Sequence, residues 1–154
     1  MDAATLVRRA ARSDLPALLQ LEALFPSDSM SRRSLRGFID ASNAVFLVAE
    51  SGGRVLGNLL LLTRRDSRRA RIYSVVVDPQ ARGLGVAQQL VESAHTAAAE
   101  RGCDAVSLEV RSDNLAARRL YAKLGYRTQA EMPGYYEDGS DGLRLSRPLE
   151  PRPA

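Results

Sequence analysis

The stretch VVVDPQARGLGVAQQLV (residues 75–91) constrains the fold more than any other part of the sequence. It opens with β-branched residues typical of a strand, breaks at Asp78-Pro79 and resumes as a helix after Gly83 and Gly85. The first amides of a helix have no intrahelical partner and lie at the positive end of the helix dipole. The stretch therefore predicts an anion site at a strand-to-helix junction, although a turn that only joins the two elements remains the alternative.

Two common phosphate-binding signatures do not fit this stretch. A Walker loop carries Lys and then Ser or Thr after its last glycine, whereas Val86 and Ala87 follow Gly85. A dinucleotide-binding fingerprint requires Gly or Ala three positions after its second glycine, where this chain has Gln88. The glycines still allow close approach of a ligand to the backbone, and Arg82 adds a permanent positive charge beside them.

Hydrophobic periodicity predicts about seven strands and about four helices. The predicted strands span residues 5–10, 44–51, 54–65, 70–79, 104–113, 126–136 and 142–149. The predicted helices span residues 13–25, 29–41, 84–101 and 114–125. This order predicts an α/β (α+β) fold in which helices flank a mixed central sheet.

Three of the predicted helices have a clear apolar face. The first predicted face contains Leu15, Leu18, Leu19 and either Leu21 or Leu24. The second contains Leu35, Phe38 and Ile39. The face of the long helix contains Leu84, Ala87, Leu90, Val91, Ala94 and Ala98.

Length and composition exclude several classes of protein. A chain of 154 residues fits one domain, here expected over residues 1–149 with a short Pro-rich tail at 150–154. No apolar run approaches the ~20 residues of a membrane span, so we expect a cytoplasmic protein with no membrane partner. The single cysteine, Cys103, and the single histidine, His95, argue against a disulfide, a histidine-based catalytic triad and a bound metal.

Basic residues are concentrated in TRRDSRRAR (residues 63–71), and the formal net charge is +4. This pattern is typical either of a solvated hairpin loop or of a patch that binds an anionic ligand or nucleic acid. Aromatic residues make up 5% of the chain and are not interleaved with the basic run, so the stacking platforms of a nucleic-acid-binding module are missing. Nucleic-acid binding is therefore only a remote alternative.

Two motifs in order resemble the GNAT acyltransferases. RGLGVA (residues 82–87) matches the arginine-x-x-glycine-x-alanine form of that family's acetyl-CoA signature, and LEVRSDNLAARRLYAKLGY (residues 108–126) resembles its next block. The predicted element order also resembles the family's fold from Leu6 to about Leu149. Within the family, the chain looks most like the amino-terminal acetyltransferases related to the ribosomal-protein alanine acetyltransferase.

The resemblance implies a fold, a cosubstrate and a set of contacts. The parallel strands 70–79 and 104–113 would splay apart, and acetyl-CoA would fill the slot between them. The main chain of three strand residues would pair with the pantetheine arm, and the amides after the strand would hold the pyrophosphate. The implied cofactor contacts are Val75, Val76, Val77, Arg82, Gly83, Leu84, Gly85, Val86, Ala87, Gln88, Asn114, Ala117 and Tyr121.

The resemblance also implies direct transfer of acetyl to an amine within a ternary complex. Tyr121 would act as the general acid near the thioester sulfur, and Glu109 as the base, often through water. An α-amine of pKa about 8 costs on the order of 1 kcal/mol to deprotonate at pH 7, whereas a lysine amine costs about 4 to 5 kcal/mol. A carboxylate base is sufficient for the first, and a strand amide near Val77 is the expected oxyanion donor.

Each assignment has a purely structural alternative. Glu109 fits a solvated or ion-paired carboxylate, Tyr121 a packed core tyrosine, and Asn114 a helix cap. Replacing Glu109 and Tyr121 without loss of any activity would favour a non-catalytic CoA-binding protein.

The acceptor is predicted from GYYEDGSDGL (residues 134–143), which resembles the loop that cups the substrate in amino-terminal acetyltransferases. Tyr135 and Tyr136 are predicted clamps, and Glu137, Asp138 and Asp141 are predicted anchors for a positive substrate. An ordinary turn between two strands is the alternative. A small amine, a polyamine or an internal lysine also remains open as acceptor, as does a monomer or a homodimer as the oligomeric state.

Overall fold

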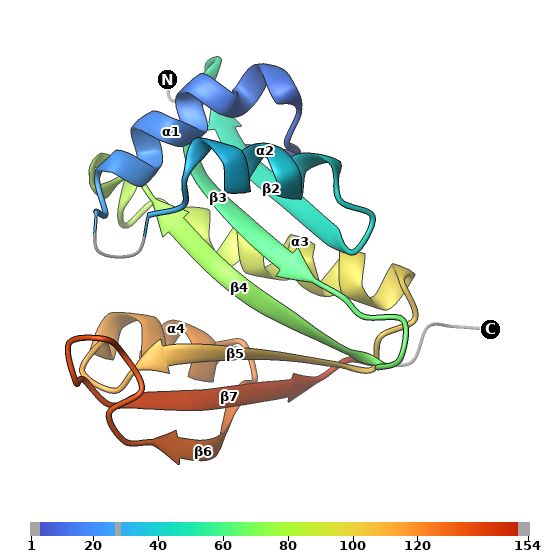
Figure 1. The fold of residues 1–154 in the computed structure, drawn as a ribbon, viewed down its shortest axis with the longest axis vertical. Coiled ribbons are helices and arrows are strands. Elements are labelled where there is room, and N and C mark those ends of the chain that lie inside the picture. The colour runs from blue at the N-terminus through green and yellow to red at the C-terminus, as the bar shows by residue number, and fades with distance from the viewer. Residues whose placement is uncertain (1–3, 27–28, 151–154) are drawn as a thin grey trace.

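A mixed sheet of seven strands forms the centre of the computed structural model, which describes residues 4–26 and 29–150 (Figure 1). The strands are β1 (Leu6–Arg9), β2 (Ala44–Ser51), β3 (Arg54–Leu62), β4 (Arg69–Val77), β5 (Ala105–Arg111), β6 (Arg127–Met132) and β7 (Gly142–Pro148). Their order in the sheet is β1-β2-β3-β4-β5-β7-β6. Within the described residues only β4 and β5 pair in parallel. The predicted fold class is confirmed.

Helices cover both faces of this sheet (Figure 1). They are α1 (Leu15–Ala23), α2 (Arg32–Asp40), α3 (Val86–Glu100) and α4 (Leu115–Lys123), with short 3₁₀ turns at Arg12–Asp14 and Pro79–Ala81. Leu15 and Leu18 of α1 and Leu35 of α2 pack on one face with Phe46 and Leu60. The larger core lies on the other face, beneath α3 and α4.

Helix ends differ from the sequence prediction at two leucines. The structure selects Leu21 rather than Leu24 for the buried face of α1, because the helix ends at Ala23 and Leu24 is 51% exposed. The prediction for Leu84 is wrong: Gly85 adopts a left-handed φ of +75° and α3 begins only at Val86. Leu84 is therefore 62% exposed, and Val86 is buried in its place.

The parallel strands β4 and β5 separate along their length. In the described part of the chain they pair over four residue pairs, from Arg69 with Ala105 to Ile72 with Leu108. Next to this joint, the β3–β4 register slips so that Tyr73 is an extra residue in β4. Such a bulge increases local twist. Beyond Ile72 the two strands diverge, as Figure 1 shows, while β5 stays paired with β7.

Gly57 in β3 sets how closely α3 approaches the sheet. A Cβ at this position would lie 2.8 Å from the carbonyl oxygen of Val76 and 3.3 Å from side-chain atoms of Leu90 and Val86. Only a residue without a side chain allows the first turns of α3 to pack there. Gly57 therefore holds the start of α3 beside the end of β4.

The described residues contain neither a membrane-spanning helix nor a cluster of metal ligands. None of their helices is long and apolar enough to span a membrane. Their His, Cys, Asp and Glu side chains form no group of three or more that could hold a metal ion. Cys103 is buried as a free thiol, and burial raises its pKa.

Candidate active site

The junction between β4 and α3 has the geometry of an anion site. The amide of Gln89 makes the first helical hydrogen bond, to the carbonyl oxygen of Gly85 at 3.1 Å, so the preceding amides point out of the helix end unpaired by the helix. Gly83 and Gly85 have φ of +83° and +75°, and beyond the adjacent residues no heavy atom of the described chain lies within 4 Å of a Cβ built on either. Arg82 is exposed beside them. This open space, ringed by donors and a cation, fits a phosphate group.

The edge of β4 beyond Ile72 is available to an extended ligand. Val75, Val76 and Val77 pair on one side with Leu59, Asn58 and Gly57 of β3. On the other side no strand of the described residues pairs with them, because β5 has already diverged. An edge of this kind can pair with an extended chain through its main-chain groups.

Helix α4 carries Tyr121, and Asn114 is its N-cap residue. The side chain of Asn114 caps α4 by accepting a hydrogen bond from the Ala117 amide at 3.2 Å. Tyr121 is 8% exposed. Burial, with a smaller contribution from Tyr136, raises the pKa of Tyr121 to about 12, so its hydroxyl is protonated at neutral pH. The hydroxyl therefore keeps a proton that it can donate, and burial makes this phenol a weaker acid than a solvated tyrosine.

A buried polar cluster lies behind Tyr121. The ring of Tyr126 packs edge-on against that of Tyr121 at 5.5 Å, and its hydroxyl lies 2.7 Å from Nε2 of His95. Arg147 donates to Nδ1 of His95. Since a guanidinium has no acceptor, Nδ1 carries no proton and the neutral ring holds its proton on Nε2. Burial, followed by the charge of Arg147, lowers the pKa of His95 to about 4.

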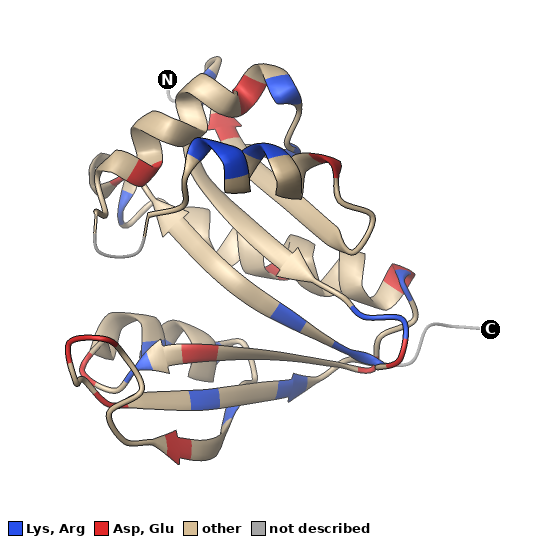
Figure 2. Ribbon diagram, in the orientation of Figure 1, with Lys and Arg blue, Asp and Glu red and all other residues tan. Residues whose placement is uncertain are grey.

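Glu109 of β5 lies between two arginines. Its Oε2 accepts from Nε of Arg71 in β4 at 3.1 Å, and its Oε1 accepts from a terminal nitrogen of Arg144 in β7 at 3.3 Å. The Glu109 side chain is 10% exposed. Figure 2 shows the same order of charge, with basic segments of β4 and β7 on either side of the acidic segment of β5. A carboxylate has about four lone-pair positions, so a water molecule can still bond to Glu109.

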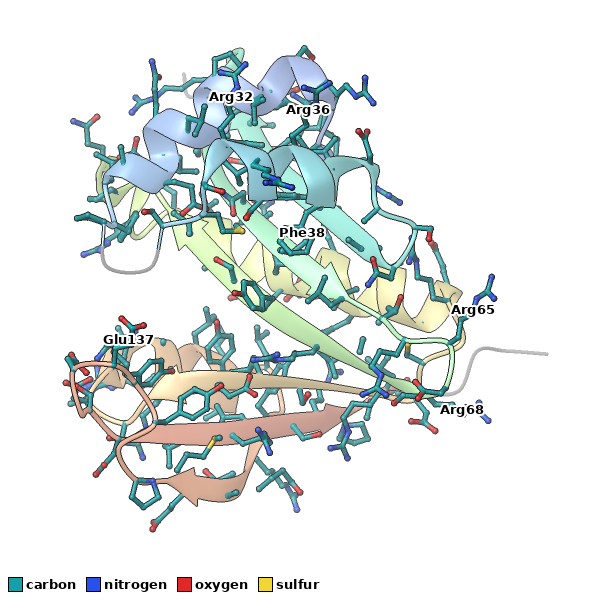
Figure 3. All side chains as sticks on the ribbon, in the orientation of Figure 1. Arg32, Arg36, Phe38, Arg65, Arg68 and Glu137 are labelled. Atoms are coloured by element: carbon teal, nitrogen blue, oxygen red, sulfur yellow. The ribbon has the colours of Figure 1, made fainter. Side chains whose placement is uncertain are left out.

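Two aromatic side chains lie near Arg71, one of the two arginines that bond to Glu109. Phe38 points from α2 toward β4 (Figure 3), and its ring centroid lies 6.2 Å from that of Tyr73. The guanidinium of Arg71 lies 5.5 Å from the centre of the Tyr73 ring. Tyr73 is 50% exposed. The bulge in β4 therefore places an exposed aromatic ring beside Arg71.

The β6–β7 connection contains the predicted acceptor loop. The rings of Tyr135 and Tyr136 meet edge to face at 5.0 Å and pack on Gly142, and Arg111 lies 4.3 Å over the ring of Tyr136. Asp138 accepts from the Ser140 amide and from Arg111, both at 2.9 Å. Hydrogen bonding from the side chain and the amide of Ser140, followed by that from Arg111, lowers the pKa of Asp138 to about 2.

Asp141 is also engaged within this loop, because it accepts from the Gly134 amide at 2.9 Å. Glu137 is exposed at the tip of the loop (Figure 3). The carboxylates that the sequence predicts as anchors for a positive substrate are thus partly used to shape the loop itself.

Sequence reasoning missed Arg71, Arg144, Arg147 and the role of His95. Each lies on an element far in sequence from its partner, so no local spacing connects them. The one usable signal is the strand alternation that puts Arg71 and Arg144 on the same side as Glu109, but it requires the strand order to be known.

Comparison with known proteins shows which family this chain belongs to. The model of the acetyltransferase (GNAT) family matches residues 13–126. An uncharacterized N-acetyltransferase of Methanocaldococcus jannaschii is 32% identical over 141 residues, which cover 91% of this chain and 89% of that protein. The N-alpha-acetyltransferase MAK3 of Arabidopsis thaliana is 31% identical over 90% of this chain and 74% of its own length.

Solved structures agree with these sequence matches. The ribosomal-protein alanine N-acetyltransferase of Escherichia coli superposes with a TM-score of 0.86 over 97% of both chains at 22% identity. Ard1 of Thermoplasma volcanium gives a TM-score of 0.86 at 26% identity, over 96% of this chain and 99% of that one. A chain of the NatC complex bound to Gag peptide and CoA gives 0.83 at 25% identity, over 95% and 99%.

Proposed function

The chain belongs to the GNAT acetyltransferase family, and on that premise we propose that it acetylates the α-amine of a protein or peptide N-terminus. The family implies acetyl-CoA as the donor. The choice of acceptor rests on the loop that carries the packed rings of Tyr135 and Tyr136, taken together with the relatives. Relatives named N-alpha-acetyltransferases are about 30% identical over 90% of this chain.

The donor would lie between the diverging strands. Its pyrophosphate would bond to the amides between Gly83 and Gln88 and to Arg82. Its pantetheine arm would pair with the free edge of β4 at Val75–Val77, and Asn114, Ala117 and Tyr121 would contact it from α4. When bound, acetyl-CoA supplies an activated acyl group, because its thioester releases a better leaving group than an amide does.

The base would come from β5 and the acid from α4. Glu109 would accept the proton of the acceptor amine through a water molecule, since both of its oxygens already accept from arginines. The amine nitrogen would attack the acetyl carbonyl, and a main-chain amide near Val77 would stabilise the oxyanion. Tyr121 would donate its proton to the departing sulfur.

The free energy needed to deprotonate the acceptor favours an α-amine over a lysine when the base is a carboxylate. Two guanidinium groups orient the carboxylate of Glu109, and an α-amine costs only about 1 kcal/mol to deprotonate at neutral pH. Lysine would cost about 4 to 5 kcal/mol. Tyr135 and Tyr136 would hold the first residues of the peptide beside this base.

The test compares two peptides by intact mass. One is free of lysine and has an unblocked N-terminus, and the other has a blocked N-terminus and one lysine. We expect acetylation of the first alone, with kcat lowered about 10²-fold in Glu109→Gln and in Tyr121→Phe. Acetylation of the lysine alone, or of neither peptide, would overturn the N-terminal acceptor, and unchanged kcat in both variants would overturn the assigned roles.

A further inference from the structure

Arg71 and Arg144 have more hydrogen-bonding capacity than Glu109 uses. Each side chain is 43% exposed, and each bonds to Glu109 through one nitrogen. In the described part of the chain, the remaining guanidinium N–H groups of both residues make no hydrogen bond; the other contact of Arg71 is the face of Tyr73. Two cations and one anion leave this cluster with a net charge of +1.

The acidic loop does not neutralise this charge. Asp138 bonds to Arg111 and to the Ser140 amide, and Asp141 bonds to the Gly134 amide. Neither carboxylate bonds to Arg71 or Arg144. The region beside Glu109 is therefore positively charged, the opposite of what a loop rich in Asp and Glu suggests for the acceptor.

We propose that Arg71 and Arg144 form a subsite for a carboxylate carried by the acceptor close to its reactive amine. The guanidinium group is planar and matches the two oxygens of a carboxylate better than any other side chain. Since Glu109 lies between the two arginines, an acceptor whose amine reaches this base presents its neighbouring groups to the same guanidinium pair. The inference rests on the proposed transfer to an amine at this site.

The carboxylate has two chemical sources. It is either the acidic side chain of the second residue of a peptide or the α-carboxylate of a short acceptor such as a dipeptide. Decapeptides with Glu, Gln or Lys as second residue and no lysine at any other position, and an Ala-Gln dipeptide with a free or an amidated C-terminus, distinguish these sources. The measured quantity is kcat/KM of each acceptor.

The native enzyme is expected to prefer the Glu peptide over the Gln peptide by about tenfold, or the free dipeptide over its amide by the same factor. The Lys peptide should be the slowest of the three. Because the arginines are partly exposed, the preference should shrink as salt is raised. In Arg71→Gln and Arg144→Gln the ratio should approach one, mainly through KM.

A ratio of two acceptors on the same variant does not depend on the folded fraction, so a destabilised variant remains informative. Arg65→Gln is the matched control, because Arg65 is exposed in the β3–β4 connection away from Glu109 (Figure 3) and should keep the native ratio. If Arg71 and Arg144 only position Glu109, both variants will lower kcat equally for every acceptor and keep the ratio.

The outcomes separate the two proposals. Equal kcat/KM for Glu and Gln peptides and for both dipeptides, with N-terminal transfer intact, overturns the carboxylate subsite alone. A ratio that survives both arginine substitutions also overturns it. No transfer to any free N-terminus overturns the proposed function, and the subsite with it.

Discussion

His95 illustrates how a single residue acquires its properties from three elements. It lies on α3, bonds to Tyr126 just after α4, and accepts from Arg147 on β7. The neutral ring stabilises Tyr126, whose ring in turn packs against Tyr121. His95 therefore supports Tyr121, the residue that we assign as the acid, through Tyr126 and without touching the reacting atoms.

The folded state should lose stability in acid because of His95. Its pKa is about 4 in the folded chain and about 6.5 when unfolded. Between these values the unfolded chain binds more protons, so the contribution of His95 is complete above pH 6.5 and is lost as pH falls through 4. The expected loss is about 2 to 3 kcal/mol.

Urea denaturation at several pH values measures this loss, with His95→Gln as the control because glutamine keeps hydrogen-bonding groups but does not titrate. The variant should show a smaller fall in unfolding free energy between pH 6.5 and 4. Parallel pH curves for the two proteins would mean that His95 is already solvated in the folded state.

At the level of elements, the packing of α3 on the sheet positions the anion site. Gly57 permits this contact, whereas the Cβ position of Gly37 in α2 has no heavy atom of the described residues within 4 Å apart from its chain neighbours and the backbone of its own helix. We expect Gly57→Ala to destabilise the fold by about 1 to 3 kcal/mol, because the new methyl group meets Val76 and Leu90. It should also raise KM for acetyl-CoA by moving the start of α3 away from β4.

Gly37→Ala is the matched substitution, and it should be neutral or stabilise by up to about 1 kcal/mol because alanine is the better helix former. Thermal unfolding and acetyl-CoA titration of both variants test the pair. Equal effects of the two substitutions would show that contact with α3 is not the reason for glycine in β3.

Sequence periodicity located the elements because each strand and helix carries its own apolar pattern. It failed at boundaries such as Leu84, where a left-handed glycine, rather than the pattern of apolar residues, decides where the helix begins. The predicted cofactor and catalytic residues lie on two local motifs, so the sequence could name them. The pairing of Glu109 with Arg71 and Arg144 depends on strand order and could not be predicted from local spacing.

At the scale of the whole molecule, two parts of the fold carry different groups of the candidate site. In the described residues, β1–β4 with α3 hold the anion site and the free edge, while β5–β7 with α4 hold Glu109 and Tyr121. A donor bound between the diverging strands β4 and β5, as proposed above, would contact both parts at once. Ligand binding should therefore stabilise the fold as a unit.

Acetyl-CoA at about 100 times its Kd should add ~2.7 kcal/mol to stability, which corresponds to about 5 to 10 °C in Tm. Arg82→Glu should reduce this shift because it repels phosphate at the mouth of the anion site. Arg65→Glu changes the net charge equally at a remote position and should keep the shift. Identical shifts in both variants would exclude Arg82 from phosphate binding.

The short joint between β4 and β5 has a mechanical consequence. Four residue pairs, Arg69–Ile72 with Ala105–Leu108, are all the pairing that connects these strands in the described chain. In the proposed complex, the alignment of donor and acid would depend on the twist between β4 and β5 at this joint, several residues away from the reacting atoms. A substitution in these four residue pairs would then shift donor and acid relative to each other, even where the substituted side chain contacts neither substrate.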